Sequence, residues 1–320
     1  MLRAGFTTVR DLGATGYANV AIAQAIEEGL CPGPRVLAAG ASLTVTGGHG
    51  DSYYRPGVSV PREGMVAGPV AAREAVRQMV RMRADVIKLL VTGGVMTDGS
   101  DVGALQWTQE ELQAAIEQAH RLGRRVAGHC HGAAGVVAAV RVGLDTVEHG
   151  TMLDEEAIGL MAERGTFLVP TLVAGQTIVE HGTAAGIAAH VVRKAVQVVE
   201  WHRKSVSRAR EAGVRVAFGT DCGTPFNRAG RNGTELALMV ACGFSPAEAL
   251  RAATSVAAQA LGLAEEIGTV EPGKAADLLV VAGDPLADVG LLADGSHVAW
   301  VVKAGRVVRR PDSAGGPGDD

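Results

Sequence analysis

The stretch RVAGHCHGAAGVVAAVRVGLDTVEHG, residues 125–150, decides the fold class of this chain. It opens and closes on short runs of strand character, and a longer stretch of helical character separates them. A strand, a helix and a second strand in this order are typical of a parallel sheet covered by helices. The apolar residues of the strand-like runs are consecutive rather than alternating, as expected for strands buried on both faces. The stretch therefore predicts an α/β fold.

The same alternation extends through most of the chain. Seven stretches have strand character, and helical stretches lie between them: residues 7–10, 35–43, 86–91, 125–129, 146–149, 167–171 and 214–219. Thr108 with Glu111 predicts a capping box and a helix from there to about residue 121. Ser245 with Glu248 predicts another, and we expect that helix to end at Gly262. Beyond it, turn residues at 272–274 and at Gly305 predict β-hairpins without crossover helices, and so a small β unit.

Composition excludes several classes of protein. The 320 residues suffice for about two domains of ~150 residues, or for one large barrel with an appendage. A hydrophobic share of 47% excludes a disordered chain, and a net charge of −4 argues against a nucleic-acid partner. The four cysteines form no CxxC motif, which fits a reducing compartment. With no signal-peptide pattern and no apolar run of membrane-spanning length, we expect a cytoplasmic protein that contacts no membrane.

One lysine stands where an apolar side chain is expected. Lys88 lies inside the run VIKLLV, residues 86–91, and burying an ammonium group is costly unless it is neutralised or paired. Three interpretations stay open. Lys88 can point to water from an edge strand, it can be an amine of low pKa for Schiff-base chemistry, or it can be modified into a metal ligand.

Histidine and aspartate side chains follow three other predicted strands. His129 and His131 come at the end of one strand, and His149 at the end of the next. Asp221 follows the last predicted strand. Functional side chains of parallel α/β folds gather at the carboxyl ends of the strands, and neutral imidazole is a common zinc ligand. Together with Lys88, the residues His129, His149 and Asp221 predict one metal centre.

With these residues in view, the sequence resembles the amidohydrolase superfamily, and within it the group of imidazolonepropionase and the Xaa-Pro or Xaa-Arg dipeptidases. The resemblance covers nearly the whole chain. The matching stretches are TTVRD at 7–11, TGGHG at 46–50, IK at 87–88, HCHG at 129–132, EHG at 148–150, GTD at 219–221 and GTVEPGKAADL at 268–278.

The resemblance implies a (β/α)8 barrel of the TIM type with a divalent metal, zinc in the first instance. Carried over, Lys88 is carbamylated by CO2 and becomes an anionic metal ligand. His129 and His149 hold one metal, and Asp221 is both a ligand and the catalytic proton shuttle. The implied reaction is hydrolysis of an amide-type C–N bond, in a dipeptide or a cyclic amide, by metal-activated water.

Other residues are assigned to the small-molecule substrate. His49, in the glycine-rich loop, is placed to polarise a carbonyl. His131 faces the same side as His129 and is a second candidate for substrate contact. Arg55 is a candidate clamp for a substrate carboxylate. In contrast, His120, His190 and His202 lie in helical stretches, and we expect them to be solvated.

The sequence departs from the family pattern at one point. The family's first barrel strand ends in a His-x-His pair, and this sequence has no histidine before His49. We therefore expect a barrel that lacks its first strand (residues 1–264, strands two to eight), a remnant of the family's β-sandwich (265–310) and a disordered tail (311–320). An open barrel exposes strand edges, so a truncated, catalytically impaired protein and pairing in a homo-oligomer both stay open. A Schiff-base lyase that uses Lys88 is the third functional alternative.

Overall fold

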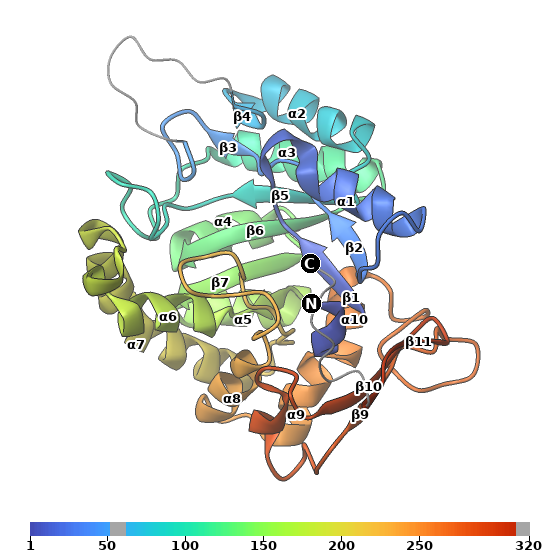
Figure 1. Ribbon diagram of the computed structural model, residues 1–320. Helices are drawn as coiled ribbons and strands as arrows, with labels where there is room; N and C mark the ends of the chain where they lie inside the picture. The colour runs from blue at the N-terminus through green and yellow to red at the C-terminus, as the bar shows by residue number, and fades with distance from the viewer. Residues whose placement is uncertain (52–61, 312–320) are drawn as a thin grey trace.

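A computed structural model describes residues 1–51 and 62–311 of the chain. Figure 1 shows parallel strands running through the middle of the molecule, helices around them, and a small separate sheet at the C-terminal end. Arg55 and most of the expected tail, residues 312–320, lie outside the described residues.

The central strands follow one another in chain order. β5 (Val86–Leu90), β6 (Arg125–Gly132), β7 (Thr146–Met152) and β8 (Phe167–Val169) form a parallel sheet. β1 (Thr8–Asp11) pairs in parallel with β2 (Arg35–Ala38), and β3 (Thr44–Val45) with β4 (Met65–Val66). A bridge between Leu43 and Leu89 connects the first segments to β5, and one between Leu168 and Val216 continues the succession beyond β8. The predicted α/β organisation is confirmed.

Two predicted strands are shorter than expected. The stretch 35–43 ends as a strand at Ala38, because Gly40 has φ 70° and turns the backbone before Leu43 pairs again. The stretch 214–219 has a single parallel bridge, at Val216. The N–H of Phe218 instead donates to the carbonyl of Ala252, outside the sheet, so the strand pairing stops there.

Ten helices accompany these strands in the described ranges. They are α1 (Ala18–Glu27), α2 (Pro69–Arg81), α3 (Gln109–Arg121), α4 (Ala133–Arg141), α5 (Glu155–Arg164), α6 (Leu172–His181), α7 (Ala189–Glu211), α8 (Thr234–Ala241), α9 (Pro246–Ala252) and α10 (Ser255–Leu261). Both predicted capping boxes are present, with Thr108 at α3 and Ser245 at α9. The prediction of a single helix from Ser245 to Gly262 is wrong. A turn at Ala253 and Thr254 interrupts the helix and divides it into α9 and α10.

The buried central strands locate the candidate site in the interior of the molecule. Every residue of β5 is buried, and all of β6 except Arg125. Across the interior, the Arg10 guanidinium on β1 donates to Glu148 on β7 at 2.8 Å and to Thr146 at 3.2 Å. Side chains from strands far apart in the sequence therefore meet inside the ring of helices.

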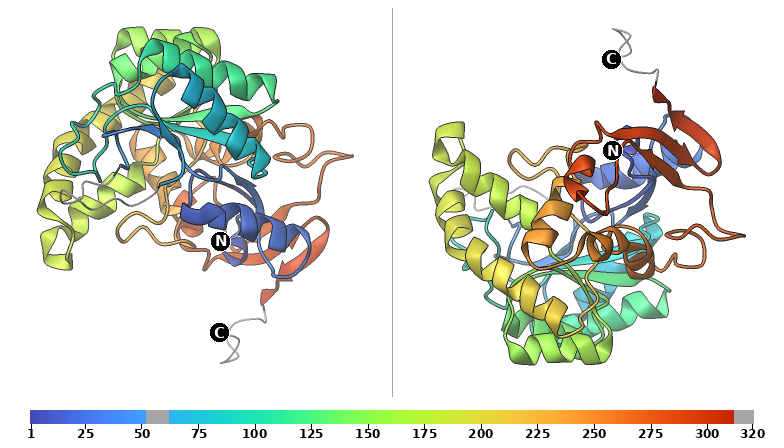
Figure 2. Two further views of the ribbon diagram at one scale, coloured as in Figure 1. Left: turned by 90° about the horizontal axis from the view of Figure 1, so that it is seen from above. Right: turned by 90° about the horizontal axis from the view of Figure 1, so that it is seen from below.

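The C-terminal β unit is a three-stranded antiparallel sheet of β9 (Leu278–Val281), β10 (Val298–Lys303) and β11 (Arg306–Arg309). The hairpin predicted at Gly305 joins β10 to β11, whereas the one predicted at 272–274 is wrong, because residues 267–271 form no strand. Figure 2 shows this sheet beside the N-terminal segment. There Lys303 donates to the carbonyl of Gly33 at 2.7 Å and Arg309 to that of Arg3 at 3.0 Å.

Among the residues that the structure describes, none of the helices combines the length and the apolar character that crossing a membrane requires.

Candidate metal centre

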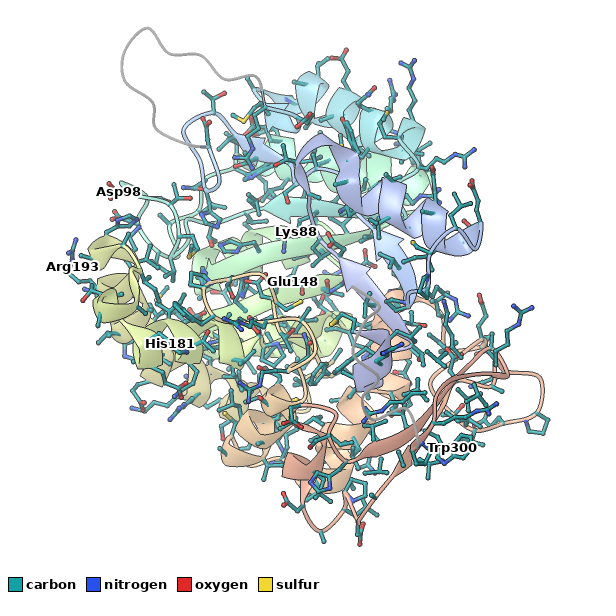
Figure 3. The ribbon with its side chains drawn as sticks, viewed as in Figure 1. Lys88, Asp98, Glu148, His181, Arg193 and Trp300 are labelled. Carbon is teal, nitrogen blue, oxygen red and sulfur yellow. The ribbon has the colours of Figure 1, made fainter. Side chains whose placement is uncertain are left out.

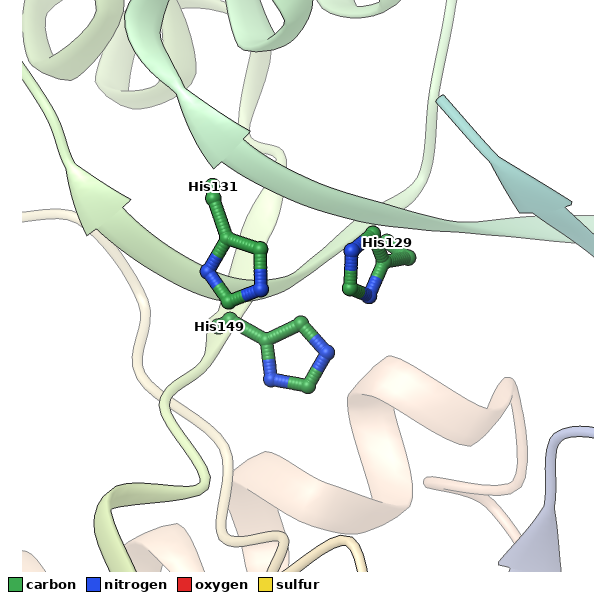
Figure 4. A group of neighbouring side chains, drawn as sticks. All are labelled: His129, His131 and His149. Atoms are coloured by element: carbon green, nitrogen blue, oxygen red, sulfur yellow. The ribbon is translucent and has the colours of Figure 1, made fainter. Parts of the chain in front are cut away.

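Three imidazoles gather where β6 and β7 end. His129 and His131 extend from β6 and His149 from β7, and Figure 4 shows their rings turned toward one another. One nitrogen from each lies within 4.8 Å of the others. All three side chains are buried, with 5 to 9% of each residue exposed. Residues i and i+2 of a strand face the same side, which explains why both histidines of β6 reach this point.

Threonine hydroxyls orient two of these rings. Nδ1 of His131 lies 2.6 Å from Oγ1 of Thr151, and Nδ1 of His149 lies 2.7 Å from Oγ1 of Thr171. With Nδ1 engaged, Nε2 of each ring is left to face the shared space. A hydrogen bond on the far nitrogen that fixes ring orientation is the usual companion of a metal-binding histidine.

The surroundings of the third ring, that of His129, show whether these residues are suited to a metal ion. Nε2 of His129 is buried and, within residues 1–51 and 62–311, has no hydrogen-bond partner. Burial, and after it the neighbouring imidazoles, lowers the pKa of His129 far below its ordinary value. Burial likewise holds the pKa of His131 and His149 well below the ordinary value. Neutral imidazoles with one unpartnered buried nitrogen are suited to a divalent metal ion.

Lys88 and two carboxylates face the same cavity. Lys88 is only 6% exposed, which rules out the solvated edge-strand interpretation. Burial lowers the pKa of the Lys88 amine, while Glu148 and Asp221 act in the opposite direction. Figure 3 shows Lys88 and Glu148 on the central strands, and Glu148 also pairs with Arg10 at 2.8 Å. Glu148 was absent from the predicted site, although it directly precedes His149 in the sequence.

Asp221 follows the last strand segment in a left-handed conformation, with φ 51°. The amide of Asn227 donates to the carbonyls of Thr220, at 2.7 Å, and of Asp221, at 3.0 Å. Asp221 is exposed as a residue, but burial of its carboxyl group removes water from it and raises its pKa, and Lys88 opposes that rise. The structure thus brings Lys88, His129, His149 and Asp221 to one cavity.

His49 lies beside the three clustered imidazoles. Its ring stacks on that of His129 with centroids 4.3 Å apart, and its Nδ1 lies 2.8 Å from Oγ1 of Thr97. A Cβ at Gly94 would come within 2.4 Å of the His49 ring, so glycine at this position leaves room for the ring where it lies. Burial lowers the pKa of His49 to about 4, and the Lys88 charge adds to that effect.

His202 corrects one expectation. It lies on α7 but is 5% exposed rather than solvated, and its Nε2 is 2.9 Å from the carbonyl oxygen of His149. Burial lowers its pKa to about 4. Val198 and Val206, four residues before and after His202, lie on the same buried face of α7, so the helical spacing of apolar residues was the signal that could have placed it. His120, as expected, is exposed, and it bonds Asp145 at 2.9 Å.

The cavity above the imidazoles has a volume of about 470 Å³ and holds His49, Lys88 and Asp221 in its lining. Apolar side chains from several elements also line it, among them Ile178 of α6 and Val198 and Val199 of α7. Volumes of about 300–1,000 Å³ are typical of small-molecule sites.

Fold and site together define an α/β protein, barrel-like in its strand succession, with a buried imidazole centre at the carboxyl ends of its strands. Residues 1–308 match the model of the amidohydrolase family, and the chain belongs to that family.

Individual relatives agree with this assignment. The ochratoxinase of Aspergillus niger is 34% identical over 97% of this chain and 67% of its own length. The imidazolonepropionase of Geobacillus kaustophilus is 31% identical over 54% of this chain and 36% of its own length. A crystal structure of a Xaa-Pro dipeptidase with methionine in its active site superposes with a TM-score of 0.90 at 37% identity, covering 96% of this chain and 76% of that one. These relatives confirm the resemblance and imply a TIM-barrel-like fold.

Proposed function

We propose that the protein is a metal-dependent hydrolase of amide-type C–N bonds in small molecules, such as dipeptides or cyclic amides. The observation that carries the proposal is the buried cluster of His129, His131 and His149, with an unpartnered Nε2 on His129 among the described residues. Family membership and the ochratoxinase and dipeptidase relatives support it.

In this proposal His129 and His149 hold a divalent metal, zinc in the first instance, with carbamylated Lys88 and Asp221 as anionic ligands. When bound, the metal supplies an activated water nucleophile at neutral pH. Asp221, whose carboxyl lines the same cavity, would accept a proton from the attacking water and return it to the leaving nitrogen. His49 polarises the scissile carbonyl, and Arg55, outside the described residues, is proposed to bind a substrate carboxylate. His131 reaches the same space and can serve either the metal or the substrate.

A panel of Xaa-Pro dipeptides and cyclic amides, assayed with and without added Zn²⁺, tests the activity. Release of the amine or carboxylate product that depends on the metal and is abolished by a chelator supports the proposal. Equal turnover after chelation would contradict it.

The number of metal ions bound per chain is a separate prediction, which depends on how the strands correspond to those of the family barrel. We propose that the central segments correspond to strands two to eight of the family barrel, over residues 1–264, and that residues 265–310 are part of its β-sandwich. The position of β1 at one end of the strand succession and of Val216 at the other supports this correspondence. The chain as given should then bind about one zinc ion. Elemental analysis after gel filtration checks this, and two ions per chain would contradict the proposed strand assignment.

Lys88 provides a further prediction. Burial favours its neutral amine, the form that attacks CO2; a C–N bond forms, a proton leaves, and a carbamate results. Protein equilibrated with ¹³C-labelled bicarbonate and zinc should show a carbamate resonance by ¹³C NMR, and the Lys88→Ala variant should lack it. If borohydride with a carbonyl compound traps a covalent adduct at Lys88 instead, the Schiff-base alternative is favoured and the carbamate assignment is wrong.

The alternative of a catalytically impaired protein predicts bound metal without turnover. Metal analysis and the substrate panel, measured on one preparation, distinguish the two.

A further inference from the structure

A carboxylate far from the metal centre in sequence caps a helix beside it. Glu235, on α8, is fully buried, with 0% of the residue exposed. Its Oε1 accepts the N–H of Leu172 and its Oε2 that of Val173, both at 2.8 Å. These are the first two residues of α6, whose N–H groups lack partners within the helix. Glu235 therefore supplies the cap of α6 from another helix.

Because Glu235 caps α6, the hydroxyl of Thr171, the residue before the helix, is free to contact another group. Thr171 occupies the N-cap position of α6, where a threonine hydroxyl ordinarily accepts an N–H from the first turn. Thr171 makes no such bond, and its Oγ1 lies 2.7 Å from Nδ1 of His149 instead. Because Glu235 binds the N–H groups, the hydroxyl of Thr171 is left for the imidazole.

The backbone at both ends of this contact is strained. Thr171 has φ 55° and His149 has φ 74°, in the left-handed region that non-glycine residues seldom adopt. Such conformations are unfavourable and persist only where surrounding contacts hold them. The bonds from Leu172 and Val173 to Glu235 hold the segment that follows Thr171.

We propose that Glu235 is a positioning residue for the metal centre: by capping α6, it keeps the Thr171 hydroxyl on Nδ1 of His149 and so aims the Nε2 of that ring. The inference rests on the proposed metal-binding function. A merely structural Glu235 would instead affect stability and leave the metal centre unchanged.

The test uses Co²⁺ as a probe, with affinity measured by chelator competition and coordination by visible absorption. Glu235→Gln keeps the side-chain volume but turns an amide NH2 toward a backbone N–H. Thr171→Ala removes the hydroxyl that contacts His149, and Thr171→Ser keeps it. Loss of a hydrogen-bond partner behind a metal ligand costs about 10- to 100-fold in affinity. We expect that loss, with a changed Co²⁺ spectrum, for Glu235→Gln and Thr171→Ala, and near-native binding for Thr171→Ser.

The double variant decides whether Glu235 acts through Thr171. If it does, adding Glu235→Gln to Thr171→Ala lowers the Co²⁺ affinity little further, because the contact is already lost.

Met239→Ala is the matched control. Met239 is on the same helix and 0% exposed, so its truncation should lower the melting temperature without altering the Co²⁺ spectrum. Should Glu235→Gln fail to fold by circular dichroism, Glu235→Asp keeps the carboxylate at shorter reach and should show an intermediate loss.

Native affinity and spectrum in a folded Glu235 variant, or independent additive losses in the double variant, would overturn this inference alone. Absence of Co²⁺ binding by the unaltered protein would overturn the proposed function, and this inference with it.

Discussion

Replacing His149 with alanine is expected to leave the purified protein almost without bound metal and to abolish amide hydrolysis. His149 contributes one of three mutually close imidazole nitrogens, and its ring is held by Thr171 at 2.7 Å. Removing a ligand should cost more than the about 10- to 100-fold lost when only a ligand's hydrogen-bond partner is removed. Elemental analysis after gel filtration, with the unaltered protein in parallel, measures the result.

His120→Ala is the control for that experiment, because His120 is exposed on α3 and lies outside the cavity lining. It should retain metal as the unaltered protein does. Unchanged metal content in His149→Ala would remove His149 from the ligand set. The variant His131→Ala assigns the remaining ring: retained metal with reduced turnover places His131 at the substrate, and lost metal makes it a ligand.

Asp221→Asn should reduce the rate of amide hydrolysis by about 10²- to 10⁴-fold, the usual contribution of a positioned acid or base. Asparagine keeps the size and one oxygen of the side chain but cannot take up the proton of the attacking water. Steady-state kinetics of product release gives the ratio of kcat values, and metal analysis of the same samples separates proton transfer from loss of ligation.

Asp284→Asn, an exposed carboxylate in the C-terminal β unit, controls for a general effect of removing one negative charge. A metal-loaded Asp221→Asn variant with full kcat would rule out Asp221 as the proton shuttle. A variant that has lost both metal and turnover would show that ligation is its larger role.

Much of the site was predictable from the sequence. Parallel strands bring their carboxyl ends to one edge of a sheet, so His129, His149 and Asp221, each placed at the end of a strand-like run, were expected to converge. Lys88 stood out because an ammonium group within an apolar run needs a reason to be there. The capping boxes of α3 and α9 were also predictable, since their partners lie three residues apart.

Other contacts join residues that are too distant in the sequence for a local pattern to reveal them. His202 contacts the His149 carbonyl from 53 positions further along the chain, and Glu235 caps α6 from 63 positions beyond Leu172. The early end of β2 at Ala38 had a local signal in Gly40, whereas the break between α9 and α10 lies within a continuous helical pattern.

The sequence by itself determined the α/β class and the polar residues that follow the strands, because consecutive apolar runs, the succession of strand and helix signals, and capping pairs act over a few residues. Only the tertiary structure decided how the rings are oriented and which buried groups hold them. Those contacts join segments that are distant in sequence, and the strained conformations of His149 and Thr171 persist only where such contacts are made.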